Sequence, residues 1–249
     1  MMKIKRTLLY AILMLASACF AERRDIAVTV DDFPFISGNT QQIQMVHQHI
    51  ADALQNHQAP ATFFVIVNRL NTSQQQNQLL QLKQQGFGIG NHTFSHLSLR
   101  HTSVPEYILD IDKADKILAP MMSTPKYFRY PYLAQGRWWW NRRKVYAFLA
   151  KEQYVIAPIT VDSRDFEFNL RMGENLDKGS LEKLKKEYLG FVWAQTLKAE
   201  HQSDLPRGRQ ILLIHTNLLN GLFLQDLLQM YEKKGYHFIS LTDALKTND

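Results

Sequence analysis

The sequence predicts an α/β fold in a single domain, a β/α barrel or a close relative of one, with about seven parallel strands. Short apolar runs alternate about seven times with longer amphipathic stretches. The apolar runs are continuous instead of alternating with polar residues, which is typical of strands buried on both faces. No glycine fingerprint for a dinucleotide or a phosphate follows any of these runs. The number of repeats favours a barrel over an open, doubly wound sheet.

The first half of the chain supplies three strands and three helices. Strands are expected at 26–30, 61–67 and 86–92, and helices at 40–57, 73–85 and 104–118. The runs IAVTV and ATFFVIV are apolar throughout, and Pro60 introduces the second run. In the first helix, Ile43, Ile50 and Leu54 fall on one face. Gly86 ends the glutamine-rich second helix and leads into the third strand.

The second half repeats the pattern with more helix. Strands are expected at 127–131, 154–160, 210–215 and 237–241, and helices at 138–151, 180–200 and 220–234, with a short helix at the end. The runs YVIAPIT and QILLIH are again almost entirely apolar. The stretch from Asn169 to Ser203 is longer than the usual connection between one strand and the next. We therefore expect a helical insertion there.

Residues 1–21 have the layout of a secretory signal peptide, which leaves 22–249 as the mature catalytic domain. Basic residues come first, an apolar stretch follows at 8–15, and small residues for cleavage stand at 16–18. The apolar stretch is too short for a comfortable transmembrane helix, although an uncleaved anchor is the alternative. We therefore expect export to the periplasm or the medium, with no membrane span after cleavage.

Cys19 is the only cysteine, and it lies inside the signal segment. No disulfide is therefore expected in the mature domain, which has to be held together by its core. A lipid anchor on Cys19 is the less favoured alternative, because the first strand starts near Ile26 and leaves little tether.

The net charge argues against a nucleic-acid partner. Removing Lys3, Lys5 and Arg6 from the 29 basic residues leaves 26 against 23 acidic residues, a net charge of +3. This balance is mild and the basic residues are scattered, so we expect no binding of nucleic acid.

Polar side chains collect where the expected strands end. Asp31 and Asp32 follow the first strand, in VTVDDFP, although alternation would send two neighbours to opposite faces of a strand. The other strands are followed by His92 and His96, by Arg129 and Tyr132, by Asp162 and Asp165, and by His215. Each residue alone has an ordinary alternative, such as a turn cap, a surface ion pair or a core histidine. Because active sites of parallel barrels lie at the C-terminal strand ends, we expect one site there, with both acids turned towards it.

His92 and His96 are four residues apart in NHTFSH, a spacing that places two imidazoles on one side of a helical turn. A surface or capping role is the alternative, since this spacing alone is a weak signal. A third ligand has to come from elsewhere in the chain, and Asp32 is the natural candidate. Two histidines and one carboxylate would leave coordination positions for water and substrate, as catalytic metal sites do.

Five segments resemble, in order, the motifs of the polysaccharide deacetylases, which are carbohydrate esterase family 4 and share the nodulation-deacetylase homology domain. The segments are TVDD (29–32), HTFSH (92–96), RYPY (129–132), DSRDF (162–166) and LIH (213–215). Each motif is weak alone, but five in the family's order are specific, and together they extend over nearly the whole mature chain. The resemblance implies a distorted (β/α) barrel with fewer than eight strands, which agrees with the strand count above.

The resemblance also implies roles for the residues that match the motifs. Asp31 would be the general base, paired with Arg129. His215 would be the general acid, oriented and charged by Asp162. The implied ligands of one divalent metal ion, usually zinc and sometimes cobalt or another divalent ion, are Asp32, His92 and His96.

The remaining implied residues belong to the substrate pocket. The backbone N–H of Tyr132 would bind the oxyanion, and Leu213 would line the pocket for the acetyl methyl group. Phe166 stands where the family usually has Trp, and Val30 where it usually has Phe. These two departures change the shape of the pocket and the packing, but they remove no reacting group.

The sequence therefore predicts a metal-dependent hydrolase that removes N-acetyl groups from N-acetylglucosamine units of a polysaccharide or oligosaccharide, either peptidoglycan or chitin-like. A related deacylase, esterase or amidase is the alternative within enzymes, and a sugar-binding pseudoenzyme is the alternative outside them. We expect a monomer.

Overall fold

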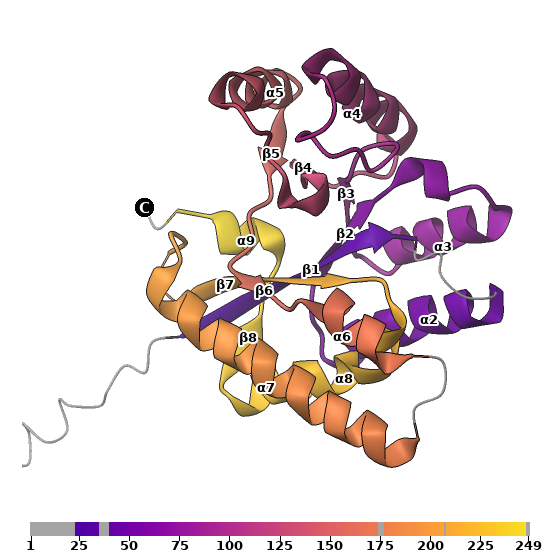
Figure 1. The fold of residues 1–249 in the computed structure, drawn as a ribbon, viewed down its shortest axis with the longest axis vertical. Helices are drawn as coiled ribbons and strands as arrows, with labels where there is room; N and C mark the ends of the chain where they lie inside the picture. Colours follow the sequence, from indigo (N-terminus) through magenta and orange to yellow (C-terminus); the bar gives the residue numbers. More distant parts are fainter. Residues whose placement is uncertain (1–22, 35–39, 174–176, 207, 248–249) are drawn as a thin grey trace, which may run out of the picture.

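The computed structural model describes residues 23–34, 40–173, 177–206 and 208–247 (Figure 1). The expected signal segment and Cys19 lie outside these residues, so export and lipid attachment stay predictions. None of the described helices has the length and apolar composition that crossing a membrane requires.

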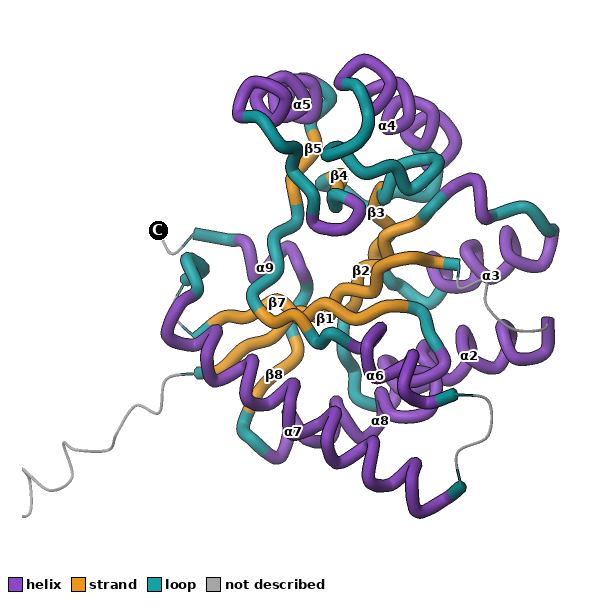
Figure 2. The backbone as a smooth tube through the Cα atoms, viewed as in Figure 1, coloured by secondary structure: helices purple, strands orange, loops and turns teal. Residues whose placement is uncertain are grey.

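The described strands form one sheet in which every pairing is parallel. They are β1 (Arg24–Phe33), β2 (Ala61–Val65), β3 (Gly88–Asn91), β4 (Lys126–Phe128), β5 (Tyr154–Ile156), β6 (Val161–Asp162), β7 (Arg209–His215) and β8 (Tyr236–Phe238). Seven follow the order β5-β4-β3-β2-β1-β7-β6, and β8 pairs with the first residues of β1. The sheet curls into a half-barrel (Figure 2), so the predicted single α/β domain with a distorted (β/α) barrel of about seven strands is confirmed.

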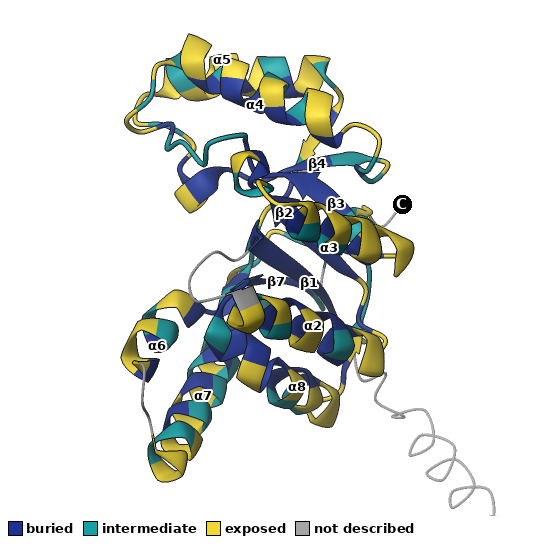
Figure 3. Cartoon of the chain, turned by 90° about the vertical axis from the view of Figure 1, so that its right-hand side faces the viewer, coloured by how far each residue is buried: buried dark blue, intermediate teal, exposed yellow. Residues whose placement is uncertain are grey.

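Helices surround this curled sheet. They are α2 (Thr40–Asn56), α3 (Ser73–Gln84), α4 (Val104–Leu118), α5 (Trp139–Lys151), α6 (Asp165–Met172), α7 (Lys178–Gln202), α8 (Leu218–Lys233) and α9 (Leu241–Leu245), with 3-10 turns η1 (Val67–Arg69) and η2 (Pro131–Leu133). α2 packs against α8, α4 packs against α5, and α7 lies across α8 and the strands β6 and β7. Figure 3 shows the strands buried between helices whose outer faces are exposed.

The expected strand at 154–160 is interrupted, and the interruption shapes the barrel. Pro158 has no backbone N–H for a strand ladder, and the pairing differs on its two sides. Ala157 donates its N–H to a carbonyl of β4, whereas Thr160 donates its N–H to a carbonyl of β7. One run of chain therefore passes from one edge of the curled sheet to the other, as β5 and then β6.

The predicted insertion between Asn169 and Ser203 is helical, but it consists of two helices. α6 ends within it at Met172, and the long helix α7 fills most of the remainder. The last expected strand, 237–241, is shorter than predicted, because Ser240 caps α9 by accepting the N–H of Asp243.

Alternate side chains of β1 and β7 point to the inside of the curled sheet. Ala27 and Ile211 belong to a small inner cluster, whereas Val28 packs in the large core with the helices. Side chains alternate along a strand, so every second residue belongs to the inward row. The paired residues of this row are Ala27–Ile211, Thr29–Leu213 and Asp31–His215. The sheet register therefore places Asp31 beside His215 at the mouth of the barrel.

Asp32 reaches the same rim as Asp31 because β1 bulges. The pairing of β1 with β2 shifts between Val30 and Phe33, and Asp32 has a left-handed backbone with φ +65°. A bulge changes the direction of a side chain relative to simple alternation. Both acids therefore line one cleft.

Candidate active site

A cleft of about 710 Å³ opens where the strands end, as predicted for a parallel barrel. Nine of the ten site residues named from the sequence line it, and the tenth, Arg129, lies buried beneath it. The lining side chains are Asp31, Asp32, Arg69, His92, His96, Tyr132, Leu133, Asp162, Phe166, Asn169, Leu170, Leu213, His215, Thr216 and Asn217. Residues that are up to 186 positions apart in the sequence therefore meet at one opening.

Asp32, His92 and His96 form the one cluster in the described chain with the spacing of a metal site. Their ligand atoms all lie within 4.8 Å of one another. Asp32 Oδ1 is 3.4 Å from His92 Nε2 and 3.0 Å from His96 Nε2. The structure thus brings together the three residues that the sequence suggested as ligands.

The hydrogen bonds of this cluster fit a bound cation. His92 Nδ1 donates to the backbone oxygen of Arg129 at 2.8 Å, which leaves the Nε2 lone pair directed at Asp32. Asp32 Oδ1 is buried and has no hydrogen-bond partner. A buried acceptor without a donor is costly, and a divalent ion between the three groups would satisfy it.

The protonation states of the cluster also suit coordination. Burial lowers the pKa of His96 below its ordinary value, although the Asp32 carboxylate opposes this effect, so the imidazole is neutral at neutral pH. Burial alone would raise the pKa of Asp32, but its contacts with His92 and His96 hold the pKa well below the ordinary value. A neutral imidazole and an ionised carboxylate are the forms that bind zinc.

Unusual backbone conformations concentrate at this cleft. Most described non-glycine residues with left-handed φ values lie here, namely Asp32, Thr93, His96, Tyr132, Leu133 and Arg164. Such conformations cost about 1–3 kcal/mol each and persist where the surrounding structure imposes them. For example, Thr93 Oγ1 accepts the His96 N–H, and Asn91 Oδ1 accepts the Thr93 N–H. The loop that carries both histidines is therefore held by its own polar contacts.

The buried side chain of Arg129 lies against Asp31. Its guanidinium is 1% exposed, stacks on the Phe64 ring at 4.7 Å and lies 3.6 Å from Asp31 Oδ2 through Nη1. Arg129 Nη2 also donates to Thr29 Oγ1 at 3.1 Å. Burial lowers the pKa of Arg129, and the Asp31 charge acts in the opposite direction. The predicted pairing of Asp31 with Arg129 is thus present as a close buried ion pair without a hydrogen bond.

The expected pairing of Asp162 with His215 is wrong, because Asp165 holds the histidine. Asp165 Oδ1 lies 2.7 Å from His215 Nδ1, and Asp165 Oδ2 accepts the His215 backbone N–H at 2.7 Å. Asp162 instead accepts the backbone N–H of Arg164 at 3.0 Å and closes a turn. Arg164 has a left-handed φ of +47°, and the turn carries Asp165 into the first turn of α6, facing β7.

Two asparagines outside the sequence motifs also bind Asp165. Asn217 Nδ2 donates to Asp165 Oδ2 at 3.0 Å, and Asn220 Nδ2 donates to the same oxygen. Asn217 also caps α8 by accepting the Asn220 N–H at 3.0 Å. The start of α8 and the partner of His215 are therefore fixed by the same contacts.

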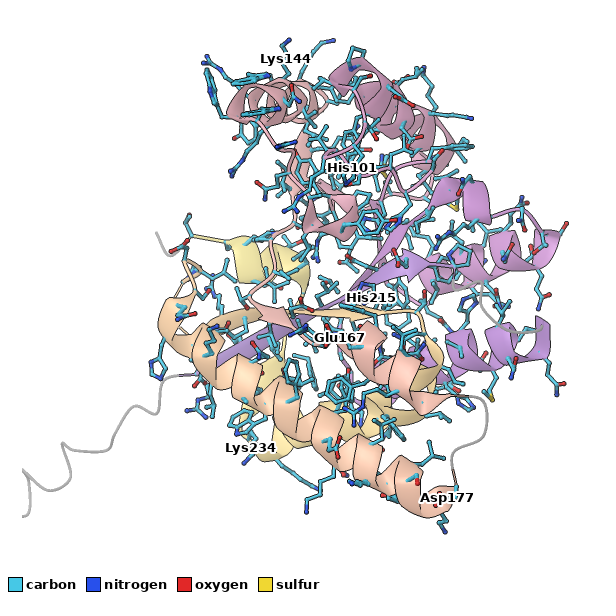
Figure 4. All side chains as sticks on the ribbon, in the orientation of Figure 1. His101, Lys144, Glu167, Asp177, His215 and Lys234 are labelled. Carbon is cyan, nitrogen blue, oxygen red and sulfur yellow. The ribbon has the colours of Figure 1, made fainter. Side chains whose placement is uncertain are left out.

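His215 is cationic at neutral pH. Burial lowers its pKa, but the Asp165 carboxylate, with smaller effects of Asp31 and Asp32, raises the pKa to about 10. Its Nδ1 is engaged with Asp165, so Nε2 is the atom that can give a proton to a group in the cleft. Figure 4 labels His215 near the middle of the molecule.

The three expected substrate-contacting residues all line the cleft. Leu213 is 3% exposed, whereas Phe166 and Tyr132 are 47% and 69% exposed at its rim. The Tyr132 ring lies 4.5 Å from the His96 ring. Among the hydrogen bonds of the described chain, none uses the Tyr132 backbone N–H, which is free to bind an oxygen.

The cleft also contains residues that no sequence motif marks. Arg69 comes from η1 after β2, and Leu170 from α6 is 79% exposed at the rim. Neither belongs to a motif, and only the fold brings them to the site.

Comparisons with known proteins agree with the sequence motifs. The chain matches the family model described as polysaccharide deacetylase over residues 21–152. It is 25% identical over 223 residues to a chitin deacetylase of Arthroderma benhamiae, covering 88% of this chain and 51% of that protein. It is 29% identical over 146 residues to a peptidoglycan-N-acetylglucosamine deacetylase of Bacillus cereus, covering 58% of this chain and 47% of that protein. The chain thus spans about half the length of these two relatives.

The fold is similar to that of solved structures. One is a family 4 carbohydrate esterase pseudoenzyme from Bacillus anthracis, with a TM-score of 0.64 and 15% identity over 90% of this chain and 66% of that one. At this identity the likeness shows the fold alone. Because the family model matches more than half of the sequence, the chain belongs to the polysaccharide deacetylase family.

Proposed function

We propose that this protein is a metal-dependent N-deacetylase that hydrolyses the acetamide of N-acetylglucosamine units in a peptidoglycan-like or chitin-like polysaccharide. The observation that carries the proposal is the Asp32, His92 and His96 cluster with its unsatisfied buried oxygen, beside Asp31 and a cationic His215. The product is acetate and a free amine on the sugar.

The residues that would hold the metal are Asp32, His92 and His96, with zinc as the expected ion and cobalt or another divalent ion as the alternative. When bound, such an ion lowers the pKa of a water from about 15.7 towards 7 and polarises the substrate carbonyl. Two imidazoles and one carboxylate would leave coordination positions for the water and for the substrate carbonyl.

Asp31 is the general base in this proposal. It takes a proton from the attacking water as the new C–O bond forms. Arg129, 3.6 Å from Asp31, holds the carboxylate in place. The inward row of β1 sets the direction of Asp31 towards the cleft.

Tyr132 acts on the carbonyl oxygen of the amide, and His215 acts on its nitrogen. The Tyr132 N–H donates to the oxyanion of the attacked carbonyl, and one such donor lowers the barrier by about 3 kcal/mol. His215 gives its Nε2 proton to the amide nitrogen, so that the C–N bond breaks and a neutral amine leaves. Leu213 lies at the base of the cleft, where it packs against the acetyl methyl group.

Acetate release from an N-acetylglucosamine tetramer tests this function. The wild-type protein with one equivalent of zinc should release acetate, and Asp31→Asn should lose nearly all of that activity while it still binds zinc. Sugar binding without acetate release by the wild type would indicate a sugar-binding pseudoenzyme. Equal rates for wild type and Asp31→Asn would remove the assigned role of Asp31.

A further inference from the structure

Arg69 is a charged residue of the cleft that the proposed mechanism does not use. It is the last residue of η1, directly after β2, and its side chain is partly exposed. Among the described residues that line the cleft, it is the one arginine or lysine.

The other cations at the site are engaged, whereas Arg69 is not. Arg129 lies against Asp31, and His215 is bonded to Asp165. Within the described chain, no hydrogen bond and no ion pair involves the Arg69 guanidinium. A permanent charge in a cleft, with five N–H donors and no protein acceptor, is available to a bound molecule.

The two sides of the cleft also carry side chains of opposite charge. Arg69 follows β2, and Asp162 ends β6, on the opposite side of β1 and β7 in the strand order. The Asp162 carboxylate carries a negative charge at this second side, and its only protein hydrogen bond in the described chain comes from the Arg164 N–H. An anionic substituent is therefore attracted to the β2 side of the cleft and repelled from the β6 side.

We propose that Arg69 is a subsite for a carboxylate carried by the glycan, so that the preferred substrate is an anionic N-acetylated polysaccharide and not a neutral one. The inference rests on the proposed deacetylase function and specifies its substrate class. The planar guanidinium fork matches a carboxylate with two parallel hydrogen bonds. The carboxylate stands on the sugar at or next to the N-acetyl group that is removed, because Arg69 and the metal cluster line the same cleft.

Matched substrates test this subsite. The anionic probe is a glycan strand of alternating N-acetylglucosamine and N-acetylmuramic acid, with free lactyl carboxylates. The neutral isostere is the same strand with its carboxylates converted to methyl esters. A hyaluronan oligomer, in which glucuronate alternates with N-acetylglucosamine, distinguishes a ring carboxylate from a lactyl one. The measured quantity is the ratio of kcat/KM for the acid over kcat/KM for the ester.

Arg69→Gln should lower this ratio about tenfold, mainly through a higher KM, because it removes a charge-assisted contact. Arg69→Lys should keep part of the ratio, since it retains the charge but not the fork. Arg143→Gln is the matched control, because Arg143 is exposed on α5 outside the cleft and its loss changes the net charge equally. In the wild type, the ratio should fall as salt screens the contact.

The proposal is overturned if wild type and Arg69→Gln have the same ratio, or if Arg143→Gln lowers the ratio as much. A calorimetric titration of the same strands into wild type and Arg69→Gln separates this inference from the proposed function. If the wild type releases no acetate from any strand, the deacetylase function fails. Tighter binding of the acid strand than of the ester, lost in Arg69→Gln, would still support the subsite, and equal binding would overturn it.

Discussion

The two halves of the cleft satisfy their buried polar atoms in different ways. In the metal half, formed by the ends of β1, β3 and β4, the described chain leaves oxygens of Asp31 and Asp32 and nitrogens of Arg129 without hydrogen-bond partners. In the acid half, formed by α6, β7 and the start of α8, Asp165 accepts bonds from the backbone N–H and the ring Nδ1 of His215 and from two asparagines.

This difference shows which half is complete without a ligand. Unsatisfied buried groups are unfavourable, so a bound cation and substrate should stabilise the metal half. The acid half is already ordered by protein contacts and has less to gain. Metal binding should therefore raise the thermal unfolding temperature through the metal half alone.

The largest expected effect follows from loss of a metal ligand. His92→Ala should lower kcat/KM for acetate release at least about 10³-fold, because several kcal/mol of transition-state stabilisation depend on the ion. It should also remove the increase in unfolding temperature that zinc gives the wild type. The exposed His101 offers a control, and His101→Ala should leave both quantities as they are. A zinc-dependent stabilisation that survives in His92→Ala would contradict the assigned ligand.

The next effect distinguishes the two acids of the DSRDF segment. Asp165→Asn should lower kcat about 10²-fold, because it weakens both the orientation and the charge of the general acid. Asp162→Asn should change kcat by less than about tenfold. The pH profile gives a readout that a merely structural role would not affect, since the alkaline limit of activity should move to lower pH in Asp165→Asn alone. A larger loss in Asp162→Asn would restore the pairing expected from the sequence.

A smaller effect concerns stability against pH. The folded protein raises the pKa of His215 from 6.5 to about 10, so its protonation stabilises the fold fully below pH 6.5. That contribution is lost as the pH rises through about 10. Urea unfolding of wild type and His215→Gln should therefore differ at pH 6 and converge near pH 10.5. His237→Gln serves as the matched control, because it removes an exposed imidazole outside the cleft.

The smallest effect is expected at the rim. Phe166→Trp restores the residue that the family usually has, at a side chain that is 47% exposed. Surface substitutions of this kind change free energies by about 0.5 kcal/mol, so kcat/KM should change within about threefold. A change of more than about thirtyfold would show that Phe166 determines the shape of the pocket.

The same two halves differ in how far the sequence could predict them. The places of Asp31 and His215 at strand ends follow from the continuous apolar strands. His92 and His96 do meet, but on a loop with left-handed residues Thr93 and His96 and not on the helical turn that their spacing suggested. The partner of His215 does not follow in this way, because the choice between Asp162 and Asp165 depends on the left-handed turn at Arg164. The sequence of the DSRDF segment alone does not predict that left-handed turn.

The interruption of the strand at Pro158 and the place of Arg69 also depended on tertiary structure. The run YVIAPIT is apolar enough for one strand, but its two parts pair with strands at opposite edges of the sheet. Arg69 lies in no motif, and only the fold shows that it lines the same cleft as the metal cluster. The meeting of the motif residues at one cleft was thus predicted, whereas the partner of His215 and the contacts of residues outside the motifs were not.

The most direct measurement is acetate release from an N-acetylglucosamine tetramer by chelated protein as zinc is added back. We expect a rate that is near zero without zinc and that rises to a plateau at one equivalent per chain. A rate that does not depend on zinc, or no acetate at any zinc concentration, would contradict a single catalytic ion held by Asp32, His92 and His96.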